Sequence, residues 1–555
     1  MREGNRMKYK WILFLMVVIL FGSVCVGCKQ EDTSSNKKQA EQNTEIEKDA
    51  EELLVAVNVD SSVAELPFAS VLLNRGRFWG TLVFQGLLIA DDSINNVEND
   101  LCEEYTVSPD GKTYVFTLRD DVYWHDGEKL TTEDVVFSIE TCLKALEVNG
   151  YVKKGLQGIE GANQYENGEQ SSITGVTCDE KNITIKMSKQ DNLFLGRLAQ
   201  LPILPKHCLE SIPVEELGGC DFWQQPIGSG PYKVVSNTDN KEAVLVLNEE
   251  YTGKKPQIKQ IRYKVLENPE TDEFDFTITS DPTTIKKFQK NNNYTVVKTG
   301  NLYYRYLYFN LDGRDSGARE DIKNNKVRQA LTMAIDRKGI IEELYKDAAI
   351  AIDTGIPEND NWYNTDNKND LSYNPTAAKE ILEHEKFDFS KPLVLTRYNS
   401  DELSVRLLEE IAEDWNAVGI KTEIIGIGSN ETNKLWVDTD WYDVGLKNLS
   451  AVDYSEWYYE YSSENQMWSV IMKNRPVFNV LIASLDGTKW AYERERLYGE
   501  IQKMETEQVF KIPLAIVPQH IIYNSKNISI PDISFWNYYY HYDLTLSHGE
   551  IIKEE

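Results

Sequence analysis

The stretch 105–141 (YTVSPDGKTYVFTLRDDVYWHDGEKLTTEDVVFSIET) constrains the fold more than any other part of the sequence. Its first part alternates between apolar and other side chains, which is the period of a half-buried strand. Turn residues at 108–111 interrupt this pattern, so a β-hairpin is predicted over 105–118. After a second turn, Thr131 is placed to cap a helix whose third residue, Asp134, reaches back toward the cap. A compact hairpin, turn and helix is therefore expected.

The composition indicates a large, acidic chain. Of its 555 residues 41% are apolar, so it holds enough apolar material for a sizeable core and is too long for one domain; two or three are expected. Asp and Glu number 89 against 59 Lys and Arg, a net charge of -30. Such a chain is repelled by nucleic acid and by anionic membrane, and its self-repulsion favours a monomer. The 12 Trp and 30 Tyr make aromatic segments candidates for ligand contact.

The N-terminus has the layout of a secretory signal. Basic residues precede an apolar run at 11–21, which is shorter than a typical membrane-spanning helix. The four residues CVGC, which end at Cys28, resemble the lipobox of bacterial lipoproteins, although the first Cys stands where Leu is usual. Residues 1–27 would then be the signal peptide, and a lipid on Cys28 would be the chain's only contact with the membrane. Residues 28–52 have almost no large apolar side chain and are predicted to be a flexible tether.

Several segments, in the same order along the chain, resemble the peptide-class extracellular solute-binding proteins of ABC importers (family 5, the oligopeptide- and dipeptide-binding proteins). The stretch 105–141 is similar to the family's signature region. VRQALTMAIDR at 327–337 matches a family helix almost residue for residue, and its apolar side chains recur with helical period, so they are expected to be core. The other matching segments are LPILPKH at 201–207, PIGSGPY at 226–232, YYRYLYFN at 303–310, YDVGLKNLSAVDY at 442–454 and IPLAIV at 512–517.

The resemblance implies an α/β fold of the two-lobed periplasmic-binding-protein type (type II, class C), with an extra α/β subdomain in the first lobe. The glycine-rich segment 226–231 is expected to approach its neighbours closely and to form a tight crossover between the lobes, because glycine permits contacts that other residues forbid. It lacks G-x-x-x-x-G-K-[ST], so a phosphate loop is not predicted. The implied domains are lobe 1 from 53–80, 220–300 and 510–555, its extra subdomain from 81–219, and lobe 2 from 301–509.

A ligand site is also implied by the resemblance. Asp453 matches the acidic position that holds the ligand's α-amino group in peptide binders, and a carboxylate facing an ammonium makes a charge-assisted, directional contact. Tyr303 and Tyr306 lie on a strand whose side chains face the cleft in the family. Ser450 stands where peptide binders often have Trp, which predicts a reshaped pocket, and Arg77 is a candidate partner for an anionic ligand group. The alternatives are that Asp453 is a loop or helix-capping residue and that Arg77 is an ordinary surface residue.

Together these features predict a binding protein that captures an oligopeptide or dipeptide between two lobes and delivers it to an ABC importer, a membrane permease with cytoplasmic ATPases. It would work at the extracellular face of the cell membrane, held by its lipid anchor. Two alternatives stay open. The solute could be an oligosaccharide or a nickel chelate, because Ser450 and nearby aromatic residues leave room for a stacking platform, or the chain could be a peptide-sensing surface receptor without transport. The platform residues would be Tyr303, Tyr306, Trp441, Trp457, Tyr458 and Tyr459.

No enzymatic activity, cofactor or metal is expected. His207 and Cys208 are adjacent, but no other Cys or His lies at metal-ligand spacing, so no metal site is predicted. His384-Glu385 lacks the second His of H-E-x-x-H, and there is no G-x-S-x-G. The cysteines beyond the N-terminal segment are odd in number, which leaves their disulfide state open: Cys102, Cys142, Cys178, Cys208 and Cys220.

Overall fold

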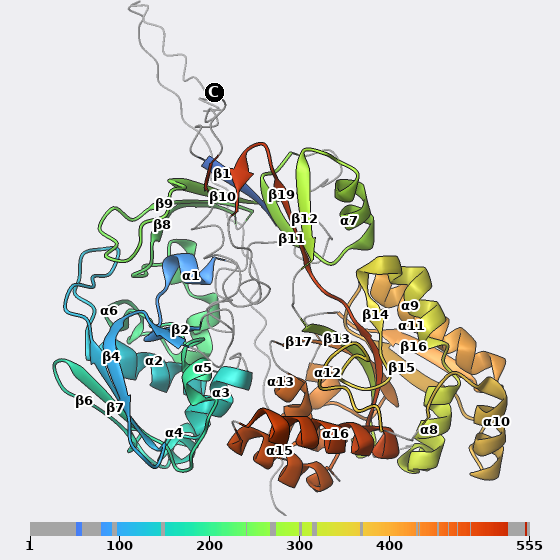
Figure 1. Cartoon of the computed structure of the whole chain (residues 1–555). Coiled ribbons are helices and arrows are strands. Elements are labelled where there is room, and N and C mark those ends of the chain that lie inside the picture. Colours follow the sequence, from blue (N-terminus) through green and yellow to red (C-terminus); the bar gives the residue numbers. More distant parts are fainter. Residues whose placement is uncertain are drawn as a thin grey trace, which may run out of the picture. The chain divides into compact units, whose positions relative to one another are not determined.

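In the computed structural model, the described residues form a seven-stranded sheet, a six-stranded sheet, a four-stranded sheet and two two-stranded ones (Figure 1). The predicted signal peptide, Cys28, the tether up to residue 51, Arg77 and Asp453 lie outside the residues that the structure describes. Those residues are 52–551, apart from 58–78, 91–96, 146–149, 240, 267–272, 299–301, 314–318, 367–369, 429–430, 432, 452–453, 464, 474, 489 and 531–549.

Seven strands form the first sheet, in the order β12-β19-β11-β1-β10-β9-β8. Strand β1 (Glu52–Val57) pairs in parallel with β10 and β11, and the other pairs are antiparallel. Helix α7 (Pro282–Gln289) packs on this sheet through Phe288, which joins a small apolar cluster with Phe274 and Ile522. The remaining strands are β8 (Tyr232–Thr238), β9 (Glu242–Leu247), β10 (Gln260–Val265), β11 (Phe276–Thr279), β12 (Tyr294–Lys298) and β19 (His520–Asn524).

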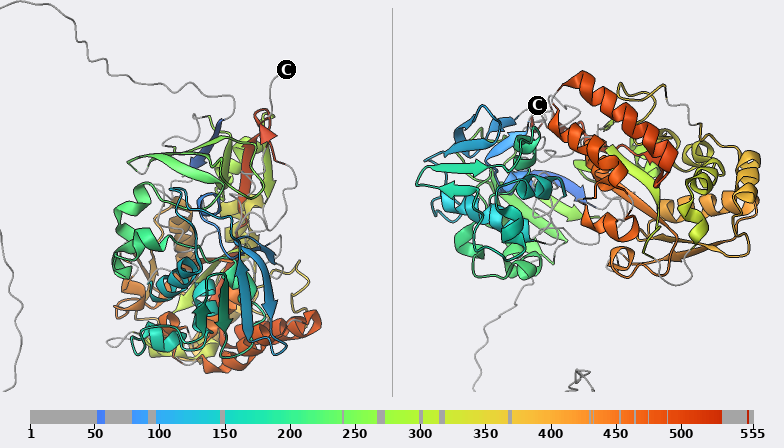
Figure 2. Two further views of the ribbon diagram at one scale, coloured as in Figure 1. Left: turned by 90° about the vertical axis from the view of Figure 1, so that its left-hand side faces the viewer. Right: turned by 90° about the horizontal axis from the view of Figure 1, so that it is seen from below.

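A separate four-stranded antiparallel sheet, in the order β4-β5-β7-β6, carries the predicted hairpin (Figure 2). Strands β4 (Cys102–Val107) and β5 (Thr113–Leu118) pair as predicted. Helix α2 (Thr132–Lys144) begins at the predicted capping box, where the backbone N–H of Thr131 donates to Asp134 at 2.8 Å. The hairpin, turn and helix are thus confirmed.

The core of this four-stranded sheet is continuous with that of one face of the first sheet. The other elements in this part of the chain are α1 (Gly80–Val83), β2 (Leu88–Ala90), β3 (Val97–Asn99), α3 (Gly150–Gln157), α4 (Ala162–Glu166), β6 (Val176–Cys178), β7 (Asn182–Lys186), α5 (Phe194–Leu198) and α6 (Lys206–Leu209), with 3-10 helices at Val214–Gly219 and Asp221–Gln224.

The glycine-rich segment 226–231 lies directly against α1. A Cβ added at Gly228 would stand 1.8 Å from the carbonyl oxygen of Val83, and one added at Gly230 would stand 2.8 Å from the same atom. The backbone N–H of Gly228 donates to Nδ1 of His125 at 3.2 Å, so Nε2–H of that ring donates to the carbonyl of Gly230 at 3.0 Å. Burial lowers the pKa of His125 to about 4, which keeps the ring neutral in this contact. The predicted close approach of these glycines is confirmed.

Six strands form the second sheet, in the order β14-β18-β13-β17-β15-β16. The central strand β13 (Leu302–Phe309) is antiparallel to both β17 (Val444–Ala451) and β18 (Lys511–Ile516), whereas β15 (Leu393–Arg397) is parallel to β17 and to β16 (Thr422–Gly426). One face packs against helices α8 to α11 and the other against α13 to α16, each with its own apolar cluster.

The elements around this sheet are α8 (Asn325–Met333), α9 (Arg337–Tyr345), β14 (Ile350–Ala351), α10 (Pro375–His384), α11 (Glu402–Ala417), α12 (Asn433–Trp436), α13 (Tyr454–Tyr458), α14 (Gln466–Ile471), α15 (Asn479–Gly487) and α16 (Ala491–Gln508). In the described part of the chain, 3-10 helices lie at Glu320–Lys323, Lys346–Ala348, Tyr459–Tyr461 and Pro476–Phe478. Two short strands, β20 (Ile528–Ser529) and β21 (Glu550–Ile551), pair with each other.

The helix predicted over 327–337 is divided into two. Its apolar stripe is buried as predicted, but α8 ends at Met333 and α9 begins at Arg337. The division falls at Asp336, whose carboxylate accepts the backbone N–H of Gly339 at 2.9 Å and so caps the second helix.

The chain passes between the two sheets from β12 into β13 and from β18 into β19. The predicted crossover at 226–231 is therefore wrong, because that segment enters β8 within a single core. Strand β18 pairs with β13, so the return to the first sheet comes after Ile516 and not at residue 510, where the lobe boundary was predicted. Among the described residues, no helix is long and apolar enough to span a membrane.

Candidate ligand-binding site

One edge of the second sheet brings together two of the positions predicted to bind ligand, Tyr303 and Ser450. Strands β15 and β17 are parallel and end there, and the antiparallel β13 begins there, so Tyr303 lies directly opposite Ser450. The backbone N–H of Val517, just after β18, donates to the carbonyl of Tyr303 at 2.8 Å. Ligands of open α/β sheets bind outside the carboxyl ends of the strands. Both passages between the two sheets also meet this edge, because β13 begins there and β18 ends there. We call it the carboxyl edge.

Tyr303 is half-buried at the carboxyl edge and packs on the side of the sheet that α8 to α11 cover. Burial raises the pKa of its hydroxyl, so the phenol is a neutral hydrogen-bonding group at physiological pH. For Ser450 the structure describes only the backbone pairing with Tyr303. The structure thus brings Tyr303 and position 450 together.

Tyr306 lies elsewhere. It is fully buried on the opposite face of the sheet, and its hydroxyl donates to Glu460 at 2.6 Å. Because side chains alternate along a strand, residues three apart point to opposite faces, so Tyr303 and Tyr306 do not line the same surface. Tyr306 thus hydrogen-bonds to a buried cluster of charged side chains in the core.

That cluster centres on Glu460, which Lys447 Nζ approaches to 2.8 Å and to which Lys511 also donates. Burial by itself would raise the pKa of Glu460, but the two ammonium groups outweigh burial and hold it well below its usual range. Burial lowers the pKa of Lys511 to about 8, with Glu460 acting in the opposite direction. The cluster is an internal ion pair network rather than a free binding surface.

Arg305, next to Tyr303, is a residue that the sequence analysis missed. It is buried, its Nε donates to the amide oxygen of Asn448 at 2.9 Å, and its other nitrogens donate to the hydroxyls of Tyr345 and Ser404. Among the described residues these hydrogen-bond partners are all neutral oxygen atoms. The guanidinium lies just behind the carboxyl edge, where the nearby carboxylate of Asp401 partly offsets its positive charge.

A polar segment after β15 also reaches this edge. Asn399 accepts from the side-chain amide of Asn448 at 3.2 Å, and its carbonyl accepts from Arg397 at 2.6 Å. The sequence signal for these residues is the polar run RYNSD that starts at the last residue of the strand at 393–397. Asp453 follows the end of β17 by two residues, and its own position is outside the described residues.

A polar contact links α15, beside the second sheet, to α3 and α5, which pack in the core of the first and four-stranded sheets. Asp486, at the end of α15, pairs with Lys154 of α3 and with Arg197 of α5, the latter at 3.3 Å. The amide of Asn192 also donates to the carbonyl of Gly487 at 2.8 Å. Only 3% of the Arg197 side chain is exposed, so this contact is largely shielded from solvent.

Known proteins resemble the chain along most of its length. The family model for bacterial extracellular solute-binding proteins, family 5 (middle region), matches residues 96–467, which is more than half of the chain. A Brucella ovis protein named as an ABC transporter peptide-binding protein is 30% identical over 371 residues, 64% of this chain and 64% of that protein. The oligopeptide-binding protein AppA of Bacillus subtilis is 27% identical over 384 residues, 66% of this chain and 64% of that protein. The chain thus matches just under two thirds of the length of these relatives.

Solved structures extend the similarity. The Bacillus subtilis AppA complex with a nonapeptide has a TM-score of 0.71 at 19% identity and covers 90% of this chain and 99% of that one. NikZ of Campylobacter jejuni in complex with Ni(L-His) has a TM-score of 0.68 at 24% identity and covers 87% of this chain and 95% of that one. These matches confirm the predicted α/β, two-lobed fold.

Proposed function

Because the chain belongs to the bacterial extracellular solute-binding proteins of family 5, we propose that it captures a short peptide at the carboxyl edge and delivers it to an ABC importer. The observation that carries this proposal is the convergence of Tyr303, position 450 and the strand end before Asp453 at that edge. The permease and its ATPases would be the partners, and the chain would be a monomer without catalytic activity, held at the outer face of the membrane by a lipid on Cys28.

In this proposal the first sheet and the four-stranded sheet form lobe 1 with its subdomain, and the second sheet forms lobe 2. The two passages between the sheets would act as the hinge, since a few residues between elements are enough to absorb a domain closure. Solute would stabilise the closed form by no more than its preference for that form over the open one.

Asp453 would hold the peptide's α-amino group. Strand β13 has β17 on one side and β18 on the other, so it offers no free edge to a peptide backbone. The chain just beyond Ala451, which includes Asp453, is where a peptide would find backbone partners at the carboxyl edge. Arg305 and, as predicted, Arg77 would favour an anionic group of the ligand.

The test is to titrate the purified full chain with a library of short peptides and to follow tryptophan fluorescence and melting temperature. The melting temperature should rise with free peptides, and the rise should disappear with N-acetylated peptides and in Asp453→Asn. Asp438→Asn, at an exposed carboxylate of the same lobe, is the matched control and should behave like the parent. An equal response of Asp453→Asn to free peptides would contradict the role of this carboxylate, and no response to any peptide would contradict the choice of solute.

The alternative solutes fare differently. A sugar-stacking platform loses support, because Trp457 and Tyr458 are fully buried in the same aromatic cluster as Tyr306. A nickel chelate keeps some support from the likeness to the NikZ fold. A peptide sensor without transport would bind the same peptides, so permease and ATPase genes beside this one would distinguish transport from sensing.

A further inference from the structure

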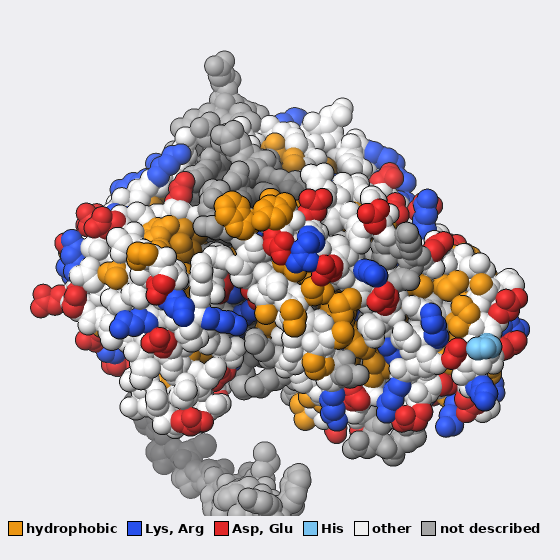
Figure 3. Space-filling view, turned by 60° about the horizontal axis from the view of Figure 1, so that its bottom comes forward, with side chains coloured by type: hydrophobic (Ala, Val, Ile, Leu, Met, Phe, Trp, Pro, Cys, Tyr) orange, Lys and Arg blue, Asp and Glu red, His pale blue; other side chains and the backbone are white. Residues whose placement is uncertain are grey.

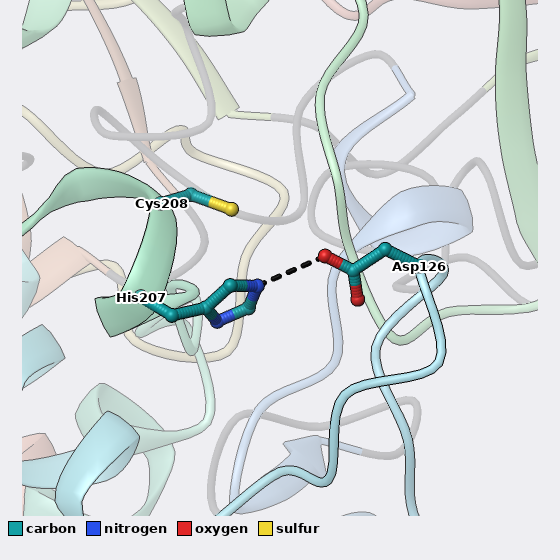
Figure 4. A group of neighbouring side chains, drawn as sticks. All are labelled: Asp126, His207 and Cys208. Atoms are coloured by element: carbon teal, nitrogen blue, oxygen red, sulfur yellow. Dashed lines mark hydrogen bonds and ion pairs between the residues drawn. The ribbon is translucent and has the colours of Figure 1, made fainter.

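Helix α6 and the turn that follows β5 bring three different metal-ligand side chains together (Figure 4). His207 and Cys208 lie on α6, and Asp126 lies on the turn, 81 residues before His207. Nε2 of His207 is 2.9 Å from an oxygen of Asp126, and one ligand atom from each of the three residues lies within 4.8 Å of the others. In Figure 4 the imidazole and the thiol both point toward the carboxylate.

Contacts outside the cluster hold both elements in place. On the turn, the ring of His125 is fixed to the glycine-rich segment, and the second oxygen of Asp126 accepts the backbone N–H of Glu128 at 3.2 Å. On α6, the backbone N–H of Lys206 donates to Asp134 at 3.0 Å. The three ligand groups are therefore preorganised by the backbone that carries them.

We propose that Asp126, His207 and Cys208 bind one Zn²⁺ ion and leave its fourth coordination position to water. Carboxylate oxygen, imidazole nitrogen and thiolate sulfur are the ligands that Zn²⁺ takes in four-coordinate sites. A carboxylate, a neutral imidazole and a thiolate together balance the charge of the ion, and the thiol proton passes to solvent when the Zn–S bond forms. The side chains of His207 and Asp126 are 36% and 31% exposed, so the ion has access from solvent.

The simpler account is that the hydrogen bond between Asp126 and His207 only ties α6 to the turn. In that account Cys208 is a partly buried side chain that packs against the neighbouring apolar core and has no role toward the Asp126–His207 pair. Cys208 therefore distinguishes the two accounts, since its replacement keeps the Asp126–His207 contact.

The experiment uses the full chain with Cys25 and Cys28 changed to Ser, so that these two supply no thiolate. Zn²⁺ binding is measured by calorimetry, and Co²⁺ serves as a spectroscopic probe. We expect one bound Zn²⁺ per chain, a thiolate-to-cobalt charge-transfer band and a higher melting temperature with metal. Cys208→Ser should abolish the band, and His207→Gln should weaken Zn²⁺ binding at least about tenfold. Cys178→Ser, at an exposed cysteine away from the cluster, should leave both unchanged.

Two results would overturn the proposal. One is a parent chain that binds no Zn²⁺, and the other is a cobalt band that survives Cys208→Ser. Cys208→Ser should melt at the parent's temperature in the absence of metal, so loss of its band cannot be attributed to unfolding. Mg²⁺, which takes oxygen ligands in octahedral geometry, should produce no stabilisation in any variant.

Discussion

Glu460 pairs with two lysines, Lys447 and Lys511, in the interior beside the second sheet, and its side chain is 6% exposed. Removing one partner of a buried ion pair leaves an uncompensated charge and costs about 3–5 kcal/mol. We expect Glu460→Gln to lower the free energy of unfolding by that amount, measured by urea denaturation with tryptophan fluorescence. The matched control is Glu500→Gln on the exposed face of α16, which should change stability by less than about 0.5 kcal/mol. Equal effects of the two variants would show that the buried charges contribute nothing.

The effect of Glu460→Gln on stability is expected to depend on pH, because Lys511 titrates in the same cluster. Burial lowers the pKa of Lys511 to about 8 from its ordinary 10.5, so between these values the unfolded chain binds more protons and the contribution of Lys511 to stability rises with pH. Loss of Glu460 would lower this pKa further. The difference in free energy of unfolding between the parent and Glu460→Gln should therefore become smaller when the pH is raised from about 7 to about 9. A difference that stays constant over this range would contradict the assignment.

At the scale of elements, the contact between α1 and the glycine-rich segment leaves no room for a side chain at Gly228. A methyl group at Gly228 would collide with the carbonyl oxygen of Val83, which is backbone and has no rotamer to change. Gly228→Ala should destabilise the chain by about 3 kcal/mol or more, because overpacking against backbone forces the elements apart. Gly218→Ala, where an added Cβ meets nothing within 4 Å, is the control and should melt close to the parent. Similar melting temperatures for both variants would mean that α1 adapts freely.

At the scale of the whole molecule, Asp486 is the residue through which the second core contacts Lys154 and Arg197 of the first. If this contact favours the closed form, Asp486→Asn should weaken solute binding by about fivefold to tenfold, the low end of coupling between two states. It should also increase the radius of gyration of the solute-free chain in small-angle X-ray scattering. Asp438→Asn should change neither quantity. Weaker binding without a change in size would place the effect of Asp486 on the solute site itself.

Local patterns predicted local structure well. The hairpin over 105–118, the capping box at Thr131 and the apolar stripe of 327–335 are all present, because each depends on side-chain period and turn chemistry within a few residues. Predictions that depended on contacts between residues far apart in the sequence were less accurate. The crossover was placed at 226–231, although the glycines there reflect contact with α1. The lobe boundary was placed at residue 510, whereas β18 pairs with β13 in the second sheet, because strand pairing is set by partners far along the chain.

Sequence by itself determined the family and the α/β class, because the order of the motifs and the periods of the apolar side chains can be read directly along the chain. Only the tertiary structure decided which side chains share a surface. It separated Tyr303 from Tyr306 by the alternation of β13, placed Arg305 behind the edge, and brought Asp126 to His207 and Cys208 across 81 residues. The physical reason is that a binding or metal site is made by the packing of distant elements, and spacing along the chain does not record that packing.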